Sequence, residues 1–102
     1  MKFLHTMVRV KDIEKSLAFY TEVLNMKLDH KKRLEDCWLY FLTDEENTCQ
    51  IELTYNDETP DGGYELGSGF GHFAFSVDSL DEFTEKINKL GYSYLYPPFD
   101  LN

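Results

Sequence analysis

The sequence has few or none of the features that mark several common functional classes. No apolar run approaches the roughly 18 residues of a membrane-spanning helix, and the N-terminus lacks the apolar stretch of a signal peptide. Basic residues are scarce, ten against 19 acidic ones, which gives a net charge of −9. Such a chain is repelled by nucleic-acid phosphates and by anionic lipid surfaces. We therefore expect neither a nucleic-acid nor a membrane partner.

Cysteine is also scarce. The two cysteines, Cys37 and Cys49, are too few for a disulfide framework and too far apart for a closely spaced metal-binding pair. We expect two buried, reduced thiols in a cytoplasmic protein. Apolar residues make up 42% of the 102 residues, which is enough for one hydrophobic core. The chain is therefore expected to form a single domain over residues 1–102.

The first half of the chain predicts a strand, a helix and three further strands. The strands are expected at residues 2–10, 26–33, 37–42 and 48–55. The helix lies between the first two, because Ile13, Leu17 and Tyr20 fall on one helical face. Asp12 is a suitable N-cap, since its carboxylate can accept a hydrogen bond from a free backbone N–H. Asn25 suits the left-handed turn that ends a helix.

The second half begins to repeat this order. A glycine- and aspartate-rich loop covers residues 57–69 and is followed by an apolar strand over 70–77. A capping box that starts at Ser79 predicts the beginning of a helix, and Gly91 its end. A further strand is expected over residues 92–96. The second half thus predicts strand, helix and strand.

The repeat is visible in the sequence itself. A histidine stands five residues before a valine in both copies, at His5 and at His72, which are 67 residues apart. Both strands are followed by a capped helix. The pattern predicts an α+β fold of paired βαβββ modules, the first over residues 1–56 and the second over 70–102, with the second module incomplete.

Alternation along the strands places polar side chains on one face of each. That face carries His5 and Arg9 in the first strand, Glu52 in the fourth, and His72 in the strand after the loop. Two imidazoles and a carboxylate are a common ligand set for borderline divalent metals. A single strand histidine is more often solvent-facing, but the repeat and Glu52 favour a metal site. His30, in a basic run, is expected to be a solvated residue of an edge strand.

Four segments resemble the glyoxalase I family of lactoylglutathione lyases, within the vicinal-oxygen-chelate superfamily. They are LHTMVRVKDIEKSLAFYTEVLNMKL (4–28), IELTYN (51–56), YELG (64–67) and GFGHFAFSV (69–77). The short chain is similar to the compact bacterial members. The resemblance covers nearly the whole sequence and implies the paired-module fold.

The resemblance also implies an activity and a ligand set. Members isomerise the hemithioacetal of methylglyoxal and glutathione to S-lactoylglutathione, with a metal that polarises the substrate and a carboxylate that moves a proton. The implied ligands are His5, Glu52 and His72, with Ni²⁺ as the metal and Zn²⁺ as the alternative. Glu52 is also the implied catalytic carboxylate, and Arg9 and Asn56 match residues that hold glutathione. A homodimer is implied, because dimeric members build each site from modules of two subunits.

One departure from the family pattern leaves alternatives open. The family's fourth ligand, a second glutamate, is expected near positions 118–119 by the repeat, whereas the chain ends at Asn102. The sequence is therefore expected to be C-terminally truncated, with lyase activity impaired. A non-catalytic binding or sequestration domain is one alternative. Another enzyme of the superfamily, such as a ring-cleaving dioxygenase or an antibiotic thiol transferase, is the second, although Arg9 and the IELTYN run favour glutathione.

Overall fold

The computed structural model describes residues 1–100. The chain divides into two compact units, the first over Met1–His72 and the second beginning at Phe73. Within the described residues, no helix is both long enough and apolar enough to cross a membrane. The predicted module boundaries, 1–56, 57–69 and 70–102, stay predictions, and residues 101–102 lie outside the described residues.

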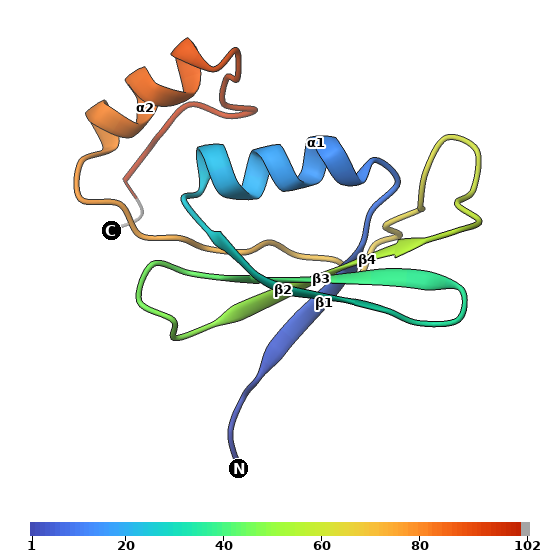
Figure 1. Cartoon of the computed structure of the whole chain (residues 1–102). Coiled ribbons are helices and arrows are strands. Elements are labelled where there is room, and N and C mark those ends of the chain that lie inside the picture. The colour runs from blue at the N-terminus through green and yellow to red at the C-terminus, as the bar shows by residue number, and fades with distance from the viewer. Residues whose placement is uncertain (101–102) are drawn as a thin grey trace. The chain divides into compact units, whose positions relative to one another are not determined.

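The first unit is a four-stranded sheet covered on one face by a helix (Figure 1). In chain order the elements are β1 (His5–Arg9), α1 (Ile13–Ala18), the π-helical turn η1 (Phe19–Val23), β2 (Lys27–Arg33), β3 (Cys37–Thr43) and β4 (Gln50–Asn56). The strand order is β1-β4-β3-β2, with β1 parallel to β4 and the other pairs antiparallel. The predicted βαβββ module and the α+β class are confirmed.

The helix begins and ends where the sequence predicts, but it is not a regular α-helix throughout. The Asp12 carboxylate accepts a hydrogen bond from the backbone N–H of Lys15 at 3.1 Å, and Asn25 adopts the left-handed conformation with a φ of 55°. Between them, η1 widens the last turns, and the N–H of Leu24 donates to the carbonyl of Phe19, five residues earlier, at 3.3 Å. Apolar periodicity does not distinguish such a turn from an α-helix.

The core lies between this helix and the sheet. Leu42 of β3 and Leu53 of β4 are fully buried, and Met26 and Ile51 are buried beside them. The partly buried side chains that pack against them come mostly from β1 and the helix: Val8, Val10, Ile13, Leu17, Tyr20, Leu24 and Tyr40. The predicted apolar faces of the first helix, β1 and β4 are therefore confirmed. Their burial leaves the opposite face of the sheet for polar residues.

The second unit contains α2 (Leu80–Lys89). The Ser79 hydroxyl accepts a hydrogen bond from the backbone N–H of Glu82 at 3.1 Å, and Gly91 follows the helix with a φ of 89°. Ile87 is buried on the apolar side of the helix. The predicted cap, helix and helix end are confirmed.

Two predicted strands are wrong. Residues 70–77 and 92–96 are not part of a strand ladder among the described residues. Side-chain alternation indicates which faces a strand would have, but a strand also needs a neighbouring backbone that exchanges hydrogen bonds with it. The described part of the chain offers no such ladder here, and Phe75 and Val77 remain exposed.

The cysteine prediction is half wrong. Both thiols are free, but only Cys37 is buried, whereas Cys49 is exposed at the turn before β4. Burial raises the pKa of the Cys37 thiol. Cys49 follows a turn in which the Asp44 carboxylate accepts a hydrogen bond from the backbone N–H of Thr48 at 2.7 Å. This turn holds the backbone at the surface, so the residue next to it stays accessible.

An ion pair ties the tip of the β2–β3 hairpin to the end of β4. Both terminal nitrogens of Arg33 donate to the Asp57 carboxylate, at 2.8 and 2.6 Å, and one also donates to the carbonyl of Glu35. The hydrogen bond from Arg33 holds the pKa of Asp57 below its ordinary value. This bidentate pair fixes the chain immediately after Asn56.

The Asp57→Asn variant is expected to be less stable at neutral pH and equally stable in strong acid. Because the folded-state pKa of Asp57 is depressed, its stabilisation is complete above the ordinary carboxyl pKa and is lost as the pH falls through the folded-state value. Urea unfolding midpoints at pH 7 and pH 2 measure the difference. Asp61→Asn, at an exposed loop residue, is the control. A deficit of the Asp57→Asn variant that persists at pH 2 would contradict the ion-pair explanation.

Candidate metal and substrate site

His5 and Glu52 meet on the face of the sheet opposite the helix. β1 and β4 run side by side in parallel, with His5 level with Gln50 and Met7 level with Glu52. The Nε2 atom of His5 lies 3.0 Å from Oε1 of Glu52. The Glu52 side chain is only 11% exposed, whereas that of His5 is 34% exposed. The pair therefore has a fixed carboxylate and an imidazole that solvent can reach.

A threonine holds the other carboxylate oxygen. The Thr54 hydroxyl donates to Oε2 of Glu52 at 2.7 Å, and this hydrogen bond is buried. Together with His5, it gives each oxygen of Glu52 one partner and fixes the plane of the carboxylate. Sequence reasoning missed this role of Thr54. The available signal is its position two residues after Glu52, which places both side chains on one face of β4.

Aromatic rings line the same face beside the pair. Phe41 of β3 lies level with Glu52 in the sheet, and its ring and that of His5 meet edge to face with centroids 5.4 Å apart. His30 of β2 stacks on Phe41 at 4.4 Å and contacts Asp29 at 2.6 Å. His30 is 53% exposed on the edge strand, as predicted, although its stacking was not foreseen. Phe41 thus separates the two histidines of this face.

The two predicted substrate-binding residues lie on this face as well. Arg9 is exposed on β1, level with Thr54 of β4. Asn56 ends β4 on the same side and is half-buried. Its Nδ2 donates to the Tyr64 hydroxyl at 2.8 Å. The guanidinium of Arg9 and the amide of Asn56 therefore lie on the same face of the sheet as the Glu52 carboxylate.

The third predicted ligand is not brought to this pair. His72 is exposed in a segment without regular structure. Among the described residues, no three His, Cys, Asp or Glu side chains form a group that could hold a metal ion. The structure thus joins His5 to Glu52 and leaves the role of His72 a prediction.

The donor chemistry of the pair nevertheless fits part of a metal site. Imidazole and carboxylate suit borderline divalent ions. Ligand bonds of about 2.0–2.2 Å place two ligand atoms of one ion roughly 3–3.5 Å apart, and the His5 and Glu52 atoms are 3.0 Å apart. The separation of the two atoms is therefore compatible with two ligands of one ion.

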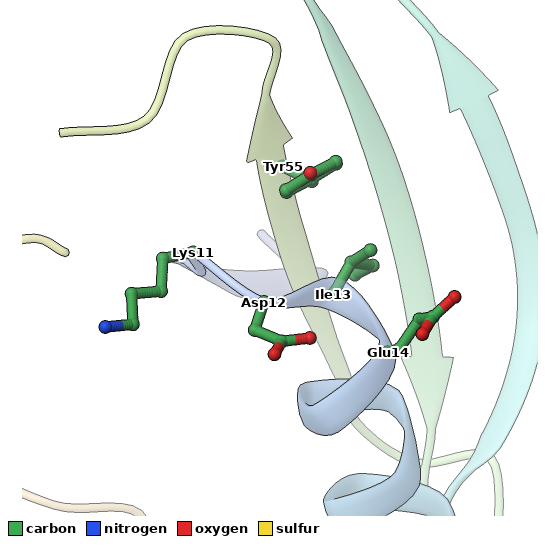
Figure 2. A pocket seen from close by; sticks show the side chains of 5 residues that line it. All are labelled: Lys11, Asp12, Ile13, Glu14 and Tyr55. Atoms are coloured by element: carbon green, nitrogen blue, oxygen red, sulfur yellow. The ribbon is translucent and has the colours of Figure 1, made fainter. Parts of the chain in front are cut away.

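A shallow depression lies elsewhere, at the start of the first helix (Figure 2). Its volume is about 400 Å³, and its lining residues are Lys11, Asp12, Ile13, Glu14 and Tyr55. Tyr55 alternates with Glu52 along β4, so its side chain belongs to the helix-covered face. Figure 2 shows the side chain of Lys11 extended away from Tyr55. The depression is therefore distinct from the His5–Glu52 pair.

Comparison with known proteins places this arrangement in a family. The profile described as the Glyoxalase/Bleomycin resistance protein/Dioxygenase superfamily matches residues 2–101. The chain belongs to this glyoxalase superfamily. Within the superfamily it is 43% identical over 96 residues to a lactoylglutathione lyase of Escherichia coli O157:H7, across 89% of this chain and 69% of that relative. A lactoylglutathione lyase of Arabidopsis thaliana is 36% identical across 88% of this chain and 32% of that relative.

Solved structures of the superfamily share the fold. The trypanothione-dependent glyoxalase I of Leishmania major superposes with a TM-score of 0.81 at 31% identity, covering 97% of this chain and 73% of that chain. Glyoxalase I of Zea mays gives a TM-score of 0.75 at 34% identity, covering 88% of this chain and 33% of that chain. The glyoxalase fold implied by the resemblance is therefore confirmed.

Proposed function

We propose that the protein is a lactoylglutathione lyase that isomerises the hemithioacetal of methylglyoxal and glutathione to S-lactoylglutathione. The observation that carries the proposal is the His5–Glu52 pair, 3.0 Å apart, in a chain 43% identical to a lactoylglutathione lyase. The free thiols of Cys37 and Cys49 suit a reducing compartment, so the proposal places the protein in the cytoplasm.

His5, Glu52 and His72 are the proposed ligands of a divalent metal, with Ni²⁺ preferred and Zn²⁺ as the alternative. When bound, the metal polarises the oxygen atoms of the substrate. Among the described residues of one chain, only His5 and Glu52 of these three donors come together. The proposal therefore takes His72 from the second subunit of a homodimer. Thr54 supports the site because its hydrogen bond fixes the carboxylate of Glu52.

Glu52 is the proposed proton carrier. The isomerisation removes one proton from the carbon bonded to sulfur and returns one to the neighbouring carbon, so a single carboxylate can take and then give the proton. Such general acid–base assistance is typically worth about 10²–10⁴-fold in rate. The buried Glu52 carboxylate contacts His5 through one oxygen and accepts a hydrogen bond from Thr54 through the other. It is suited to the role because it does not need to reorient before the transfer.

The direct test is to load the purified protein with Ni²⁺ and follow S-lactoylglutathione formation from methylglyoxal and glutathione. A panel of diols and other thiols serves as the comparison for the remaining enzymes of the superfamily. Turnover of the hemithioacetal, without turnover of the diols and other thiols, supports the proposal. Binding of S-lactoylglutathione without turnover would instead identify a non-catalytic binding domain.

The Arg9→Ala variant is expected to bind S-lactoylglutathione more weakly by roughly 1–3 kcal/mol. Arg9 is proposed to clamp a carboxylate of the glutathione part, and the loss is that of a hydrogen bond to a charged group. Titration calorimetry with S-lactoylglutathione measures the effect. Lys11→Ala, which removes the same charge two residues later, is the control. Equal binding by both variants would contradict the role given to Arg9.

A further inference from the structure

The backbone around Asn56 is held from three sides. Asn56 pairs with Cys37 across the β3–β4 ladder, and the next residue, Asp57, donates its N–H to the carbonyl of Asp36 at 3.0 Å. The carbonyl of Asn56 itself accepts a hydrogen bond from the Thr59 hydroxyl at 3.2 Å. With the backbone fixed, only the side-chain torsions of Asn56 remain to be set.

Tyr64, in the loop after β4, sets the side-chain torsions of Asn56. The Tyr64 hydroxyl accepts the hydrogen bond from Nδ2 of Asn56 at 2.8 Å, in a half-buried contact. The turn that precedes Tyr64 is closed by a hydrogen bond from the N–H of Gly63 to the carbonyl of Pro60 at 2.9 Å. It uses positive φ values at Gly62 and Gly63, 79° and 91°, which other residues rarely adopt. The loop is therefore shaped to bring Tyr64 to the end of β4.

We infer that Tyr64 is a positioning residue that, by accepting the hydrogen bond from Nδ2, holds the Asn56 carboxamide with Oδ1 directed to the bound substrate. The inference rests on the proposed function, in which Arg9 and Asn56 bind the glutathione part. Tyr64 acts through Asn56 and does not need to contact the substrate.

The chemistry follows from the two ends of a carboxamide. Its oxygen only accepts hydrogen bonds and its nitrogen only donates them, and the two atoms point in different directions. Because Nδ2 is directed to Tyr64, Oδ1 points away from it as an acceptor. The γ-glutamyl end of glutathione carries both a carboxylate and an ammonium group. Arg9 supplies donors for the carboxylate, and Oδ1 of Asn56 supplies the acceptor for the ammonium group.

Removal of the Tyr64 hydroxyl lets the carboxamide rotate and present its N–H groups instead. The Tyr64→Phe variant is therefore expected to bind S-lactoylglutathione about threefold to tenfold more weakly, the range of one neutral hydrogen bond. The ratio of the affinity for S-lactoylglutathione to that for its derivative with an acetylated α-amino group should also decrease. Titration calorimetry with both compounds measures this ratio, which a purely structural role of Tyr64 would not change.

Two controls separate the possible outcomes. Tyr55→Phe removes a hydroxyl near the same end of β4 on the opposite face, and it should leave the ratio unchanged. In an Asn56→Ala background, Tyr64→Phe should have no further effect on binding. An unchanged ratio in the single variant, or an undiminished effect without Asn56, would overturn the inference alone. A wild-type protein that binds neither compound would overturn the proposed function and this inference with it.

Discussion

Replacement of Glu52 by Gln, or of His5 or His72 by Ala, is expected to abolish stoichiometric Ni²⁺ binding. Glu52→Gln keeps the size of the side chain but removes the charge that offsets the cation. His5→Ala removes the imidazole nitrogen that lies 3.0 Å from this carboxylate. Among the described residues, no other three His, Cys, Asp or Glu side chains form a group that could hold a metal ion. Titration calorimetry with Ni²⁺ gives the stoichiometry directly.

His30→Ala is the matched control for this experiment. His30 lies on the same face but is separated from His5 by the ring of Phe41, against which it stacks. The His30→Ala variant should therefore bind Ni²⁺ as the wild type does. If all the histidine variants bound equally, the ligand assignment would be wrong. If the His72→Ala variant retained full binding while the His5→Ala and Glu52→Gln variants lost it, His72 would leave the ligand set and His5 and Glu52 would stay in it.

The first module could be predicted closely from the sequence because its signals are local. Alternation in β1 and β4, the Asp12 cap and the left-handed turn at Asn25 each depend on a few neighbouring residues. Residues 70–77 carry the same alternation but do not form the predicted strand. Strand formation depends on a backbone partner that no local pattern specifies. The π-helical turn was missed for a related reason, since it shifts hydrogen bonds by one residue and leaves the apolar stripe in place.

The site was predictable to the extent that it follows from strand geometry. His5 and Glu52 could be placed on one face by alternation, and the parallel pairing of β1 with β4 then brings them together. Thr54 has the same signal but was not singled out. Tyr64 had no periodic signal, because it lies in a loop whose path is set by a glycine turn and by its contact with Asn56. The role of such a loop residue becomes visible only in the folded structure.

The Leu53→Ala variant is expected to lose about 2–5 kcal/mol of unfolding free energy, the usual cost of removing a fully buried leucine side chain. Leu53 is completely buried between the sheet and the helix, where the lost contacts leave a cavity. Urea unfolding should show a lower midpoint with an unchanged slope. Leu66→Ala is the control, because Leu66 is 69% exposed and should cost little. Equal losses in both variants would contradict the assignment of the core.

The same substitution tests how the core supports the site. Leu53 lies between Glu52 and Thr54 on β4, with its side chain on the helix side and theirs on the other. A cavity beneath this part of β4 loosens the backbone that holds the carboxylate, so Leu53→Ala should also weaken Ni²⁺ binding under conditions in which the protein remains folded. Leu66→Ala should leave binding unchanged. Wild-type affinity in a folded Leu53→Ala protein would show that the hydrogen bond from Thr54 orients Glu52 without help from the core.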